Sequence, residues 1–451
     1  MNIFKTPDNY LYSNRALLYL FIPILVELAL EFFVGLADSI MVASLGESAI
    51  SGVSLVDFLV QLLIFSFSAL GTGGAVVAGQ YLGNKQQKEA QNASTQLVWF
   101  SAIASTILMI AVILLRHTLT NVVFGQIEAD VWHNAELYLY IVALSIPFIA
   151  VYNAGAGLFR TTNDSYLPMK IMFVCDVLNV IGNAICIYYL GWDVRGVAVP
   201  TVLSRVLAAL ITVYYVIDED YELHIKRTLK HRFDLRILKK VLKVGIPSGI
   251  ENGLIQLGRV LVLSLVSTFG TVAIAANSVG NTVGVFSMLP GFAINLGLTA
   301  VVSQCVGADD FEQAKYYNKK CMMLVVISHT IINAVIFALL PHILAIYNLS
   351  PETAALASQM VIWQGIFAII IWPLAFTLPA TFRGAGDSKT VMYISAIVMF
   401  ACRIGLAYII ADCMGIGVFG TWIATFIDWY VRSGLFVYRY FSNKWMEYRV
   451  I

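Results

Sequence analysis

The chain has 451 residues, of which 59% are hydrophobic and only 12% are charged, and its formal net charge is +1. Soluble globular chains are about a quarter charged, so this composition excludes an ordinary soluble domain, and the near-neutral charge excludes a bulk nucleic-acid-binding surface. Six scattered cysteines without a Cys-x-x-Cys spacing argue against a disulfide framework or a zinc site.

Runs of about 20 largely apolar residues recur along the whole chain, and each is long enough to cross a bilayer as a helix. The sequence therefore predicts an all-α polytopic membrane protein in contact with the lipid bilayer. The twelve predicted spans lie near residues 16–39, 53–81, 95–115, 135–158, 168–190, 196–217, 241–268, 272–303, 321–346, 357–381, 390–411 and 417–439.

The first span contains three carboxylates, Glu27, Glu31 and Asp38. On a helix, Glu31 and Asp38 lie only about 40° and about 20° around the axis from Glu27, so the three side chains share one stripe. A carboxylate near the middle of a span costs roughly 2.5–3.5 kcal/mol on insertion scales. We therefore expect the stripe to face a wet cavity or a partner, or to be protonated, where it can hold a proton or cation and attract a cationic compound. Glu27 lies about one turn after Pro23, so bonding to freed backbone or to a neighbouring helix is its alternative role.

Further polar side chains recur at helical spacing in later spans. Asp57 and Gln61 lie one turn apart in the second span, and Asp176, Asn179 and Asn183 form a stripe in the fifth. The stripe is a candidate for the coupling cation, and Asp57 and Gln61 are candidates for the substrate. The other candidate substrate contacts are Glu27, Tyr152, Asn153, Glu251 and Met288.

Structural roles compete with these assignments. Core packing or lipid contact is the alternative for Tyr152 and Met288, because aromatic and methionine side chains are ordinary components of packed helices. For Glu251 the alternatives are an ion pair with Arg259, two turns away, or a contact that holds two helices together. Structural ion pairing is also the simpler interpretation of Arg403 and Asp428.

The distribution of Lys and Arg predicts the orientation in the membrane. Of the 28 basic residues, 22 lie in the N-terminus, the C-terminus and the even-numbered connections, and the odd-numbered connections contain only Arg116 and Arg195. Cytoplasmic loops carry the excess of positive charge. Both termini are therefore predicted to be cytoplasmic in a multi-pass protein of the cell (plasma or inner) membrane.

The chain also repeats itself at an offset of 224 residues, which predicts an N-terminal lobe (1–217), a cytoplasmic linker (218–240) and a C-terminal lobe (241–451). Each half has six spans, so the halves are parallel repeats around a central cleft, an architecture suited to alternating access. The linker is either a solvated connection or an amphipathic surface helix. The matches are Pro23 with Pro247, Glu27 with Glu251, Gly196 with Gly420, Thr201 with Thr425 and, at an offset of 223, LFRTTNDS (158–165) with TFRGAGDS (381–388).

These features together resemble the multidrug and toxic compound extrusion (MATE) family over nearly the full length of the chain. The resemblance rests on the span from Pro23 to Asp38, the segments LGESAISGVSL and AGQYLGNKQQKEA, the two Arg-x-x-x-Asp turns and the Gly-x-x-x-x-Thr starts of spans six and twelve. It implies a secondary transporter that exports organic, often cationic or amphipathic, compounds in exchange for inward protons or sodium ions.

The resemblance also implies a cation site in the N-terminal lobe. Carried over residue by residue, it joins Asp38 to Asn179, Asn183 and Thr201, and these oxygen-bearing side chains are the possible Na⁺ site. Some members have a second site, with a glutamate two turns after the proline of span seven. Here that position is Ile255, and span ten has no acid, which argues against a second cation site.

The predicted function is thus multidrug efflux by a monomeric antiporter that needs no cofactor beyond its coupling ion, H⁺ or Na⁺. The alternative is a flippase or exporter of a lipid-linked saccharide or another amphipathic metabolite, which requires arginines at the cleft. An intramembrane enzyme requires a paired catalytic constellation, and the sequence offers none.

Overall fold

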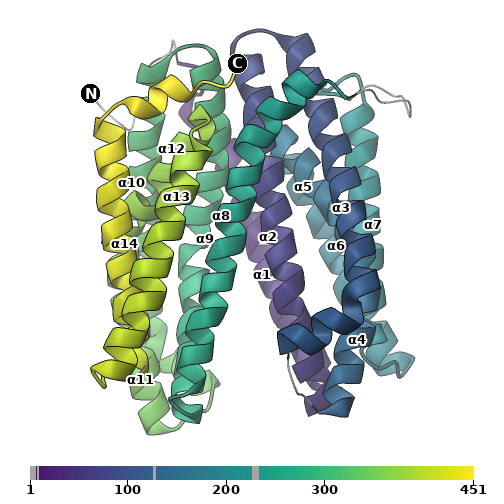
Figure 1. The fold of residues 1–451 in the computed structure, drawn as a ribbon, viewed down its shortest axis with the longest axis vertical. Helices are drawn as coiled ribbons and strands as arrows, with labels where there is room; N and C mark the ends of the chain where they lie inside the picture. The colour runs from purple at the N-terminus through teal and green to yellow at the C-terminus, as the bar shows by residue number, and fades with distance from the viewer. Residues whose placement is uncertain (1–6, 8–9, 125–127, 226–232) are drawn as a thin grey trace. The chain divides into compact units, whose positions relative to one another are not determined.

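The computed structural model describes residues 7, 10–124, 128–225 and 233–451, and its regular structure over these residues is entirely helical (Figure 1). The first half contains α1 (Asn14–Ala43), α2 (Glu47–Gly83), α3 (Gln87–Phe124), α4 (Ala129–Ala143), α5 (Ile146–Thr161), α6 (Tyr166–Ala184), the π-helical η1 (Ile185–Tyr189) and α7 (Arg195–Ile217). The second half contains α8 (Leu235–Ser267), α9 (Thr271–Gly307), α10 (Phe311–Ile346), α11 (Pro351–Ile370), η2 (Pro373–Thr377), α12 (Leu378–Ala385), α13 (Ser388–Val398), η3 (Met399–Gly405), η4 (Tyr408–Cys413), α14 (Val418–Phe441) and the short 3₁₀ turn η5 (Lys444–Tyr448).

Every predicted span coincides with one helix or with a run of consecutive helices. Among the described residues, ten helices are long and apolar enough to cross a membrane, and α4 with α5, bent by 48° at their junction, make an eleventh. The segment predicted at 417–439 is α14, whose buried Asp428 and Arg432 make it less apolar. The prediction of an all-α, multi-span membrane protein is confirmed.

The chain forms two compact units. One, the N-terminal unit, comprises Leu18–Gly249 with Ile451, and the other, the C-terminal unit, comprises Ile250–Val450 with Met1–Leu17. These bounds differ from the predicted lobes 1–217 and 241–451 because the first helix of each half is divided between the units. Residues 226–232 of the predicted linker lie outside the described residues, and α8 already begins at Leu235.

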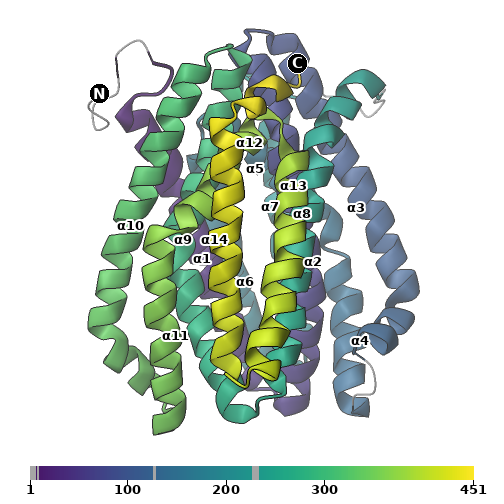
Figure 2. The ribbon, with the colours of Figure 1, turned by 60° about the vertical axis from the view of Figure 1, so that its left-hand side comes forward.

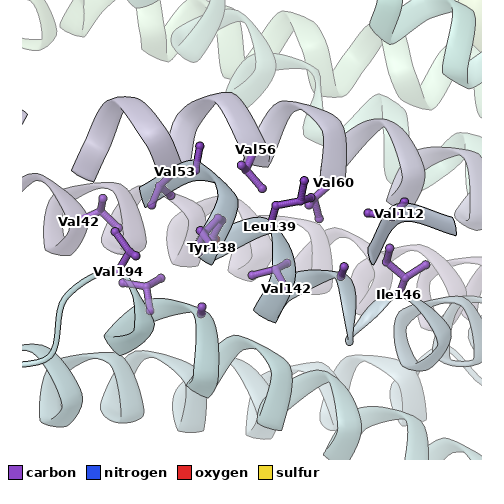
Figure 3. Packing of buried hydrophobic residues seen from close by; sticks show 14 of the residues in the cluster. Val42, Val53, Val56, Val60, Val112, Tyr138, Leu139, Val142, Ile146 and Val194 are labelled. Atoms are coloured by element: carbon purple, nitrogen blue, oxygen red, sulfur yellow. The ribbon is translucent and has the colours of Figure 1, made fainter. Parts of the chain in front are cut away.

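In the N-terminal unit, α2 is the central helix and packs against α3, α4 and α5. Its valines at positions 53, 56 and 60 meet Tyr138, Leu139 and Val142 of α4 (Figure 3). The spacing of three and four residues places these valines on one face of α2, so the contact fixes how α4 lies on it. The short helix α4 thereby covers the apolar face of α2 that these valines form.

The glycine-rich stretch GTGGAVVAG of α2 allows two other helices to approach closely. A Cβ atom placed on Gly73 would lie 3.0 Å from the Cα atom of Gly245 in α8, and one on Gly71 would lie 2.8 Å from the backbone oxygen of Asn153 in α5. Helix α2 itself continues without a break from Glu47 to Gly83. The glycines thus act as packing notches of the small-residue type common in membranes.

Gly71→Ala is expected to destabilise the protein by about 1–3 kcal/mol, because its methyl group meets α5 backbone that cannot rotate away. Gly35→Ala in α1 is the matched control, since nothing lies within 4 Å of a Cβ atom there. Thermal unfolding of both purified variants in detergent measures the difference. Equal midpoints for the two variants would contradict the notch.

In the C-terminal unit, α9 is the central helix and packs against α10, α11 and α12. The residues before α1 also belong to this unit and dock on α10. The backbone N–H of Tyr12 donates to Tyr317 Oη at 2.8 Å, the same hydroxyl donates to the Tyr12 carbonyl at 2.9 Å, and the N–H of Leu11 donates to Gln313 Oε1 at 2.9 Å. Helix α1, which carries the acidic stripe, therefore starts from an anchored end.

The π-helical turns explain how the repeat regains its register after the two arginine turns. A π turn accommodates one extra residue in a helix. The stretch from Asp387 to Gly415 is one residue longer than its counterpart from Asp164 to Gly191, and it contains two π-helical segments, η3 and η4, where the counterpart contains only η1. The offset thus returns from 223 at the arginine turns to 224 at Gly191 and Gly415 through a local adjustment within one span.

Candidate functional site

A chain of polar side chains links α1, α6 and α7 within the N-terminal unit. The amide nitrogen of Asn183 donates to Asp38 Oδ1 at 2.7 Å and lies 3.3 Å from Asn179 Oδ1. The amide nitrogen of Asn179 donates in turn to Thr201 Oγ1 at 3.1 Å, and that hydroxyl donates to the carbonyl of Val197 at 2.8 Å. The structure therefore brings together all four residues that the family resemblance assigned to a cation site.

Two oxygen atoms at this chain are buried without a hydrogen-bond partner. They are Asn183 Oδ1 and Oδ2 of Asp176, which lies one turn before Asn179 on α6. Asn179 and Asn183 are almost fully buried, whereas Asp38 is half-buried and hence accessible from the unit's surface. Burying an oxygen without a hydrogen-bond partner costs free energy unless a donor or a cation binds to it. Carboxylate, amide and hydroxyl oxygens are suitable ligands for a hard cation, so the donor set fits Na⁺ and the carboxylates fit a proton.

Asn183→Leu is expected to raise the concentration of coupling cation needed for half-maximal transport about tenfold. The change removes the hydrogen bond that Asn183 donates to Asp38 together with an unpartnered oxygen, a loss of about 1–2 kcal/mol. Transport into proteoliposomes at graded Na⁺ or proton concentrations measures the shift. An unchanged half-maximal concentration would remove Asn183 from the site.

The candidate acids Glu31 and Asp57 have different surroundings from those of Asp38. Glu31 is exposed, and an exposed carboxylate in a membrane span must meet water rather than hydrocarbon. Asp57 accepts a hydrogen bond from Tyr138 Oη at 3.0 Å. Among the described residues of the same unit, the cation Arg205 makes no bond to these acids and donates instead to Ser145 Oγ at 2.8 Å.

The other predicted substrate contacts are divided between surface and core. Gln61 is exposed, and Asn153 is half-buried with an unpartnered amide nitrogen. Met288 is buried inside the C-terminal unit, and Tyr152 is buried in the N-terminal unit. Their predicted contact with substrate stays a prediction.

Glu27 is part of a buried ion pair. Arg160 Nη2 lies 2.8 Å from Oε1 and 2.9 Å from Oε2 of Glu27, and Tyr152 Oη donates to the same carboxylate at 2.7 Å. The side chains of Glu27 and Arg160 are only 6% and 7% exposed. Both carboxylate oxygens are therefore occupied, which leaves little capacity for a further ligand.

The second half repeats this ion pair. Arg383 Nη2 lies 2.8 Å from Glu251 Oε1, Arg383 Nε lies 3.2 Å from Oε2, and Ser395 Oγ donates to Oε1 at 2.8 Å. Glu251 thus pairs with Arg383, not with Arg259, and serves as a contact between helices. Both members of the pair occupy repeat positions, so the ion pair is a feature shared by the two halves.

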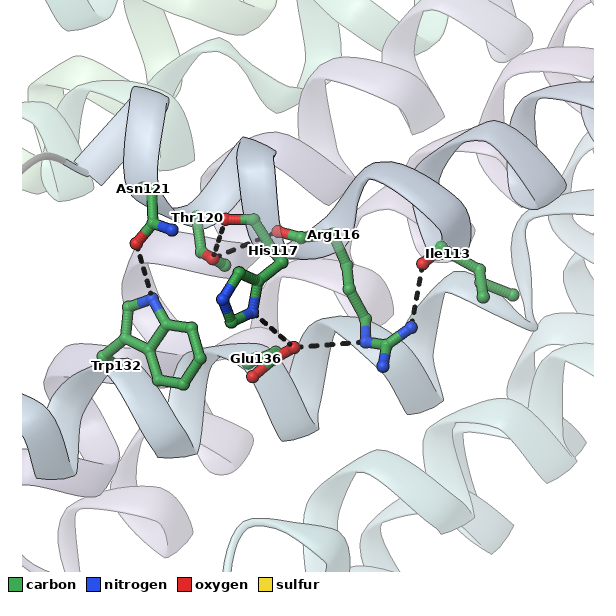
Figure 4. A network of polar contacts seen from close by, with 7 residues as sticks. All are labelled: Ile113, Arg116, His117, Thr120, Asn121, Trp132 and Glu136. Atoms are coloured by element: carbon green, nitrogen blue, oxygen red, sulfur yellow. Dashed lines mark hydrogen bonds and ion pairs between the residues drawn. The ribbon is translucent and has the colours of Figure 1, made fainter.

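A third polar network lies away from these groups, between the C-terminal part of α3 and α4 (Figure 4). Arg116 Nε lies 3.2 Å and His117 Nδ1 3.3 Å from Oε1 of Glu136, and Trp132 Nε1 donates to Asn121 Oδ1 at 3.1 Å. Arg116 is one of only two basic residues predicted in the odd-numbered connections. Its charge is balanced locally, which supports a role in holding α4 against α3.

Sequence reasoning did not identify the partners of the acids. Arg160 and Arg383 belong to the two Arg-x-x-x-Asp turns, and Tyr138 lies in an apolar predicted span. A signal was present, since an acid and an arginine both recur at repeat positions and a pair that recurs together is expected to interact. No comparable signal points to Tyr138, because its contact depends on the bend between α4 and α5.

Comparison with known proteins identifies the family of this chain. The MatE family model matches twice, at residues 23–185 and 247–409, so the two matches are themselves 224 residues apart. The chain is 27% identical to the transporter YisQ of Bacillus subtilis (98% of this chain, 97% of that protein) and 25% identical to the probable multidrug resistance protein NorM of Thermotoga maritima (97% and 94%). The fold superposes with a TM-score of 0.88 on a crystal structure of MATE in complex with MaL6, at 21% identity and over 96% and 97% of the two chains. The chain belongs to the multidrug and toxic compound extrusion family of membrane transporters.

Proposed function

We propose that this transporter exports organic compounds, including cationic ones, in exchange for protons or sodium ions that enter at Asp38. The observation that carries the proposal is the chain from Asp38 through Asn183 and Asn179 to Thr201, together with the unpartnered buried oxygens of Asn183 and Asp176. The multidrug resistance proteins among the relatives support efflux as the activity. The coupling ion and the membrane orientation, with both termini cytoplasmic, belong to the proposal.

The coupling follows from competition for one carboxylate. A proton or Na⁺ on Asp38 neutralises the charge that attracts a cationic compound, so the occupied and the empty site prefer different ligands. One positive charge that moves inward through 100 mV releases about 2.3 kcal/mol. This energy suffices to export a compound against a gradient of about fiftyfold without ATP.

Asp38 suits this role better than Glu27 because of their surroundings. Glu27 is bonded to Arg160 and Tyr152 and is almost fully buried, whereas Asp38 is half-buried and bonded to a neutral amide. A group that exchanges ligands must be reachable and must not be satisfied by a fixed opposite charge. Glu31 is exposed two turns before Asp38 and supplies a second negative charge on the same face of α1.

The test is uptake of fluorescent organic cations by proteoliposomes under separately imposed proton and sodium gradients. Accumulation that depends on one gradient and collapses when an ionophore dissipates it supports the proposal and identifies the ion. Absence of gradient-driven movement for every cation tested overturns it. Empty liposomes and liposomes containing the Asp38→Asn variant are the controls.

A lipid-linked saccharide exporter is the second candidate and would need cationic side chains free to bind an anion. Two of the four intramembrane arginines are engaged, Arg432 with Asp428 at 2.9 Å and Arg205 with Ser145. The remaining two, Arg259 and Arg403, lie in the C-terminal unit. Cation-coupled efflux stays the first proposal because the candidate site of the N-terminal unit is acidic.

A further inference from the structure

Two arginines in spans of the C-terminal unit have no acidic partner among the described residues. Arg259 lies in α8 and is exposed, and its one hydrogen bond goes to Gln256 Oε1 at 3.4 Å. Arg403 lies in η3 and is half-buried. Within the described part of the chain, neither guanidinium approaches an acid to within ion-pair distance, in contrast to the arginines of the two Glu–Arg pairs.

The acids that could serve them are already occupied. Glu251, two turns before Arg259 on the same helix, is bonded to Arg383 and Ser395. The charge of Asp428 acts on Arg403, but both Asp428 oxygens are bonded to Arg432, at 2.9 and 3.2 Å. Among its described residues, the C-terminal unit therefore contains two positive charges without an ion-pair partner.

Arg259 and Arg403 lie in the same part of the C-terminal unit. A Cβ atom on Gly258 would lie 2.5 Å from Met399 Sδ, so α8 packs closely on the start of η3. Arg259 directly follows Gly258, and Arg403 lies one turn after Met399. The groups are near enough for the charge of Arg403 to act on Arg259. Figures 1 and 2 show α8 beside α13, the helix that continues into η3.

The internal repeat allows these two arginines to be compared with the corresponding part of the first half. At the 224-residue offset, Arg259 corresponds to Gly35, which lies between Glu31 and Asp38 on α1, and Arg403 lies in the stretch that corresponds to the part of α6 around Asn179. Where the N-terminal unit gathers carboxylates and neutral oxygens, the C-terminal unit places two cations. The equivalent places in the two halves therefore have opposite polarity.

We propose that Arg259 and Arg403 form a binding site for an anionic group, a carboxylate or a phosphate, of the transported compound. Two like charges in membrane spans are costly and are stabilised by an anion between them. Guanidinium groups are the side chains best suited to bind carboxylate or phosphate oxygens with paired hydrogen bonds. The inference rests on the proposed transport function and extends its substrates from cations to zwitterionic and anionic amphipathic compounds.

Rhodamine 110 and its methyl ester, rhodamine 123, test the site because they differ only in a free carboxylate. Fluorescence anisotropy measures their binding to the purified protein in phosphatidylcholine nanodiscs. Arg403→Gln and Arg259→Gln are each expected to weaken binding of rhodamine 110 about tenfold, the loss of one charge-assisted hydrogen bond, and to leave rhodamine 123 unchanged. Arg195→Gln is the matched control, since this exposed arginine pairs with Asp193 near the start of α7, and it should change neither dye.

Equal binding of rhodamine 110 to the wild type and to both variants overturns the proposal. A phosphate of an anionic lipid offers the same chemistry, so the measurement is repeated in nanodiscs that contain phosphatidylglycerol, with bound lipid counted by native mass spectrometry. Loss of bound phosphatidylglycerol in the variants, with unchanged rhodamine 110 affinity, would assign the site to lipid and overturn its role in substrate binding. If gradient-driven transport of rhodamine 123 fails while the arginine-dependent difference persists, the proposed function falls and the anion site stands.

Discussion

The Asp38→Asn variant is expected to lose ion-coupled export by about a hundredfold while it inserts and folds like the wild type. An asparagine at position 38 can still accept the hydrogen bond from Asn183, so the polar chain of α1, α6 and α7 keeps its shape. It cannot bind a proton at physiological pH, and it offers a cation one charge less. The lost interaction of about 2–3 kcal/mol corresponds to a factor of roughly thirty to a hundred and fifty in affinity for the coupling ion.

Two measurements separate loss of coupling from loss of protein. The initial rate of gradient-driven uptake of an organic cation reports coupling, and the amount of monodisperse protein extracted from membranes reports folding. Asp193→Asn is the control, because Asp193 is half-exposed near the start of α7 and pairs only with the exposed Arg195. It removes the same charge from the chain and should transport at the wild-type rate.

Substrate exchange without a gradient sharpens the result. Because Asp38 is proposed to bind the coupling ion and the cationic substrate in turn, Asp38→Asn should still exchange substrate down its own concentration gradient, but with a raised KM. Uptake by Asp38→Asn that responds to an imposed ion gradient like the wild type would show that another group, with Glu31 the first to examine, carries the ion.

The sequence predicted the fold well because membrane spans depend on local composition. Each of the twelve apolar runs became a helix or a short series of helices, since hydrocarbon leaves a backbone no other way to satisfy its polar groups. The repeat was equally visible, because glycine, proline and charged positions recur at one offset. The division of α1 and α8 between the two units was not predictable, since it depends on contacts such as Tyr12 with Tyr317 that join distant segments.

The members of the candidate site were predicted from the sequence, and the bonds that neighbouring helices make to the acids of α1 were not. Asp38, Asn179, Asn183 and Thr201 came from the family pattern, and the structure places them in one hydrogen-bonded chain. The acidic stripe of α1, by contrast, suggested three equivalent carboxylates. Helical periodicity says which side chains share a face of one helix, but it says nothing about the neighbouring helix, which supplies Arg160 to Glu27 and Asn183 to Asp38.

The second large effect concerns the Glu27–Arg160 ion pair and its counterpart, Glu251–Arg383. Replacing Arg160 with Met is expected to lower the free energy of unfolding by about 3–5 kcal/mol, because it leaves the buried carboxylate of Glu27 without its counter-charge. Tyr152 donates one hydrogen bond to this carboxylate and cannot neutralise it. Denaturant titration of the purified protein in detergent measures the change.

The double variant Glu27→Leu with Arg160→Met should recover most of this loss. Removing both charges leaves no ion to desolvate, and apolar replacements of buried ion pairs are often neutral in stability. Arg383→Met is the matched variant in the second half. Its expected loss is smaller, because the Arg383 side chain is 22% exposed against 7% for Arg160, and Glu251 keeps a donor in Ser395.

The same series decides between a structural and a substrate-binding role for Glu27. If the ion pair only holds α1 to α5, the double variant that is stable again should also transport with a wild-type KM, since neither side chain touches the substrate. If Glu27 binds the cationic substrate as well, the double variant will be stable but its KM will rise about tenfold or more. A stable double variant with wild-type KM therefore removes Glu27 from the substrate site, and the two remaining acids of α1, Glu31 and Asp38, then account for cation recognition in this half.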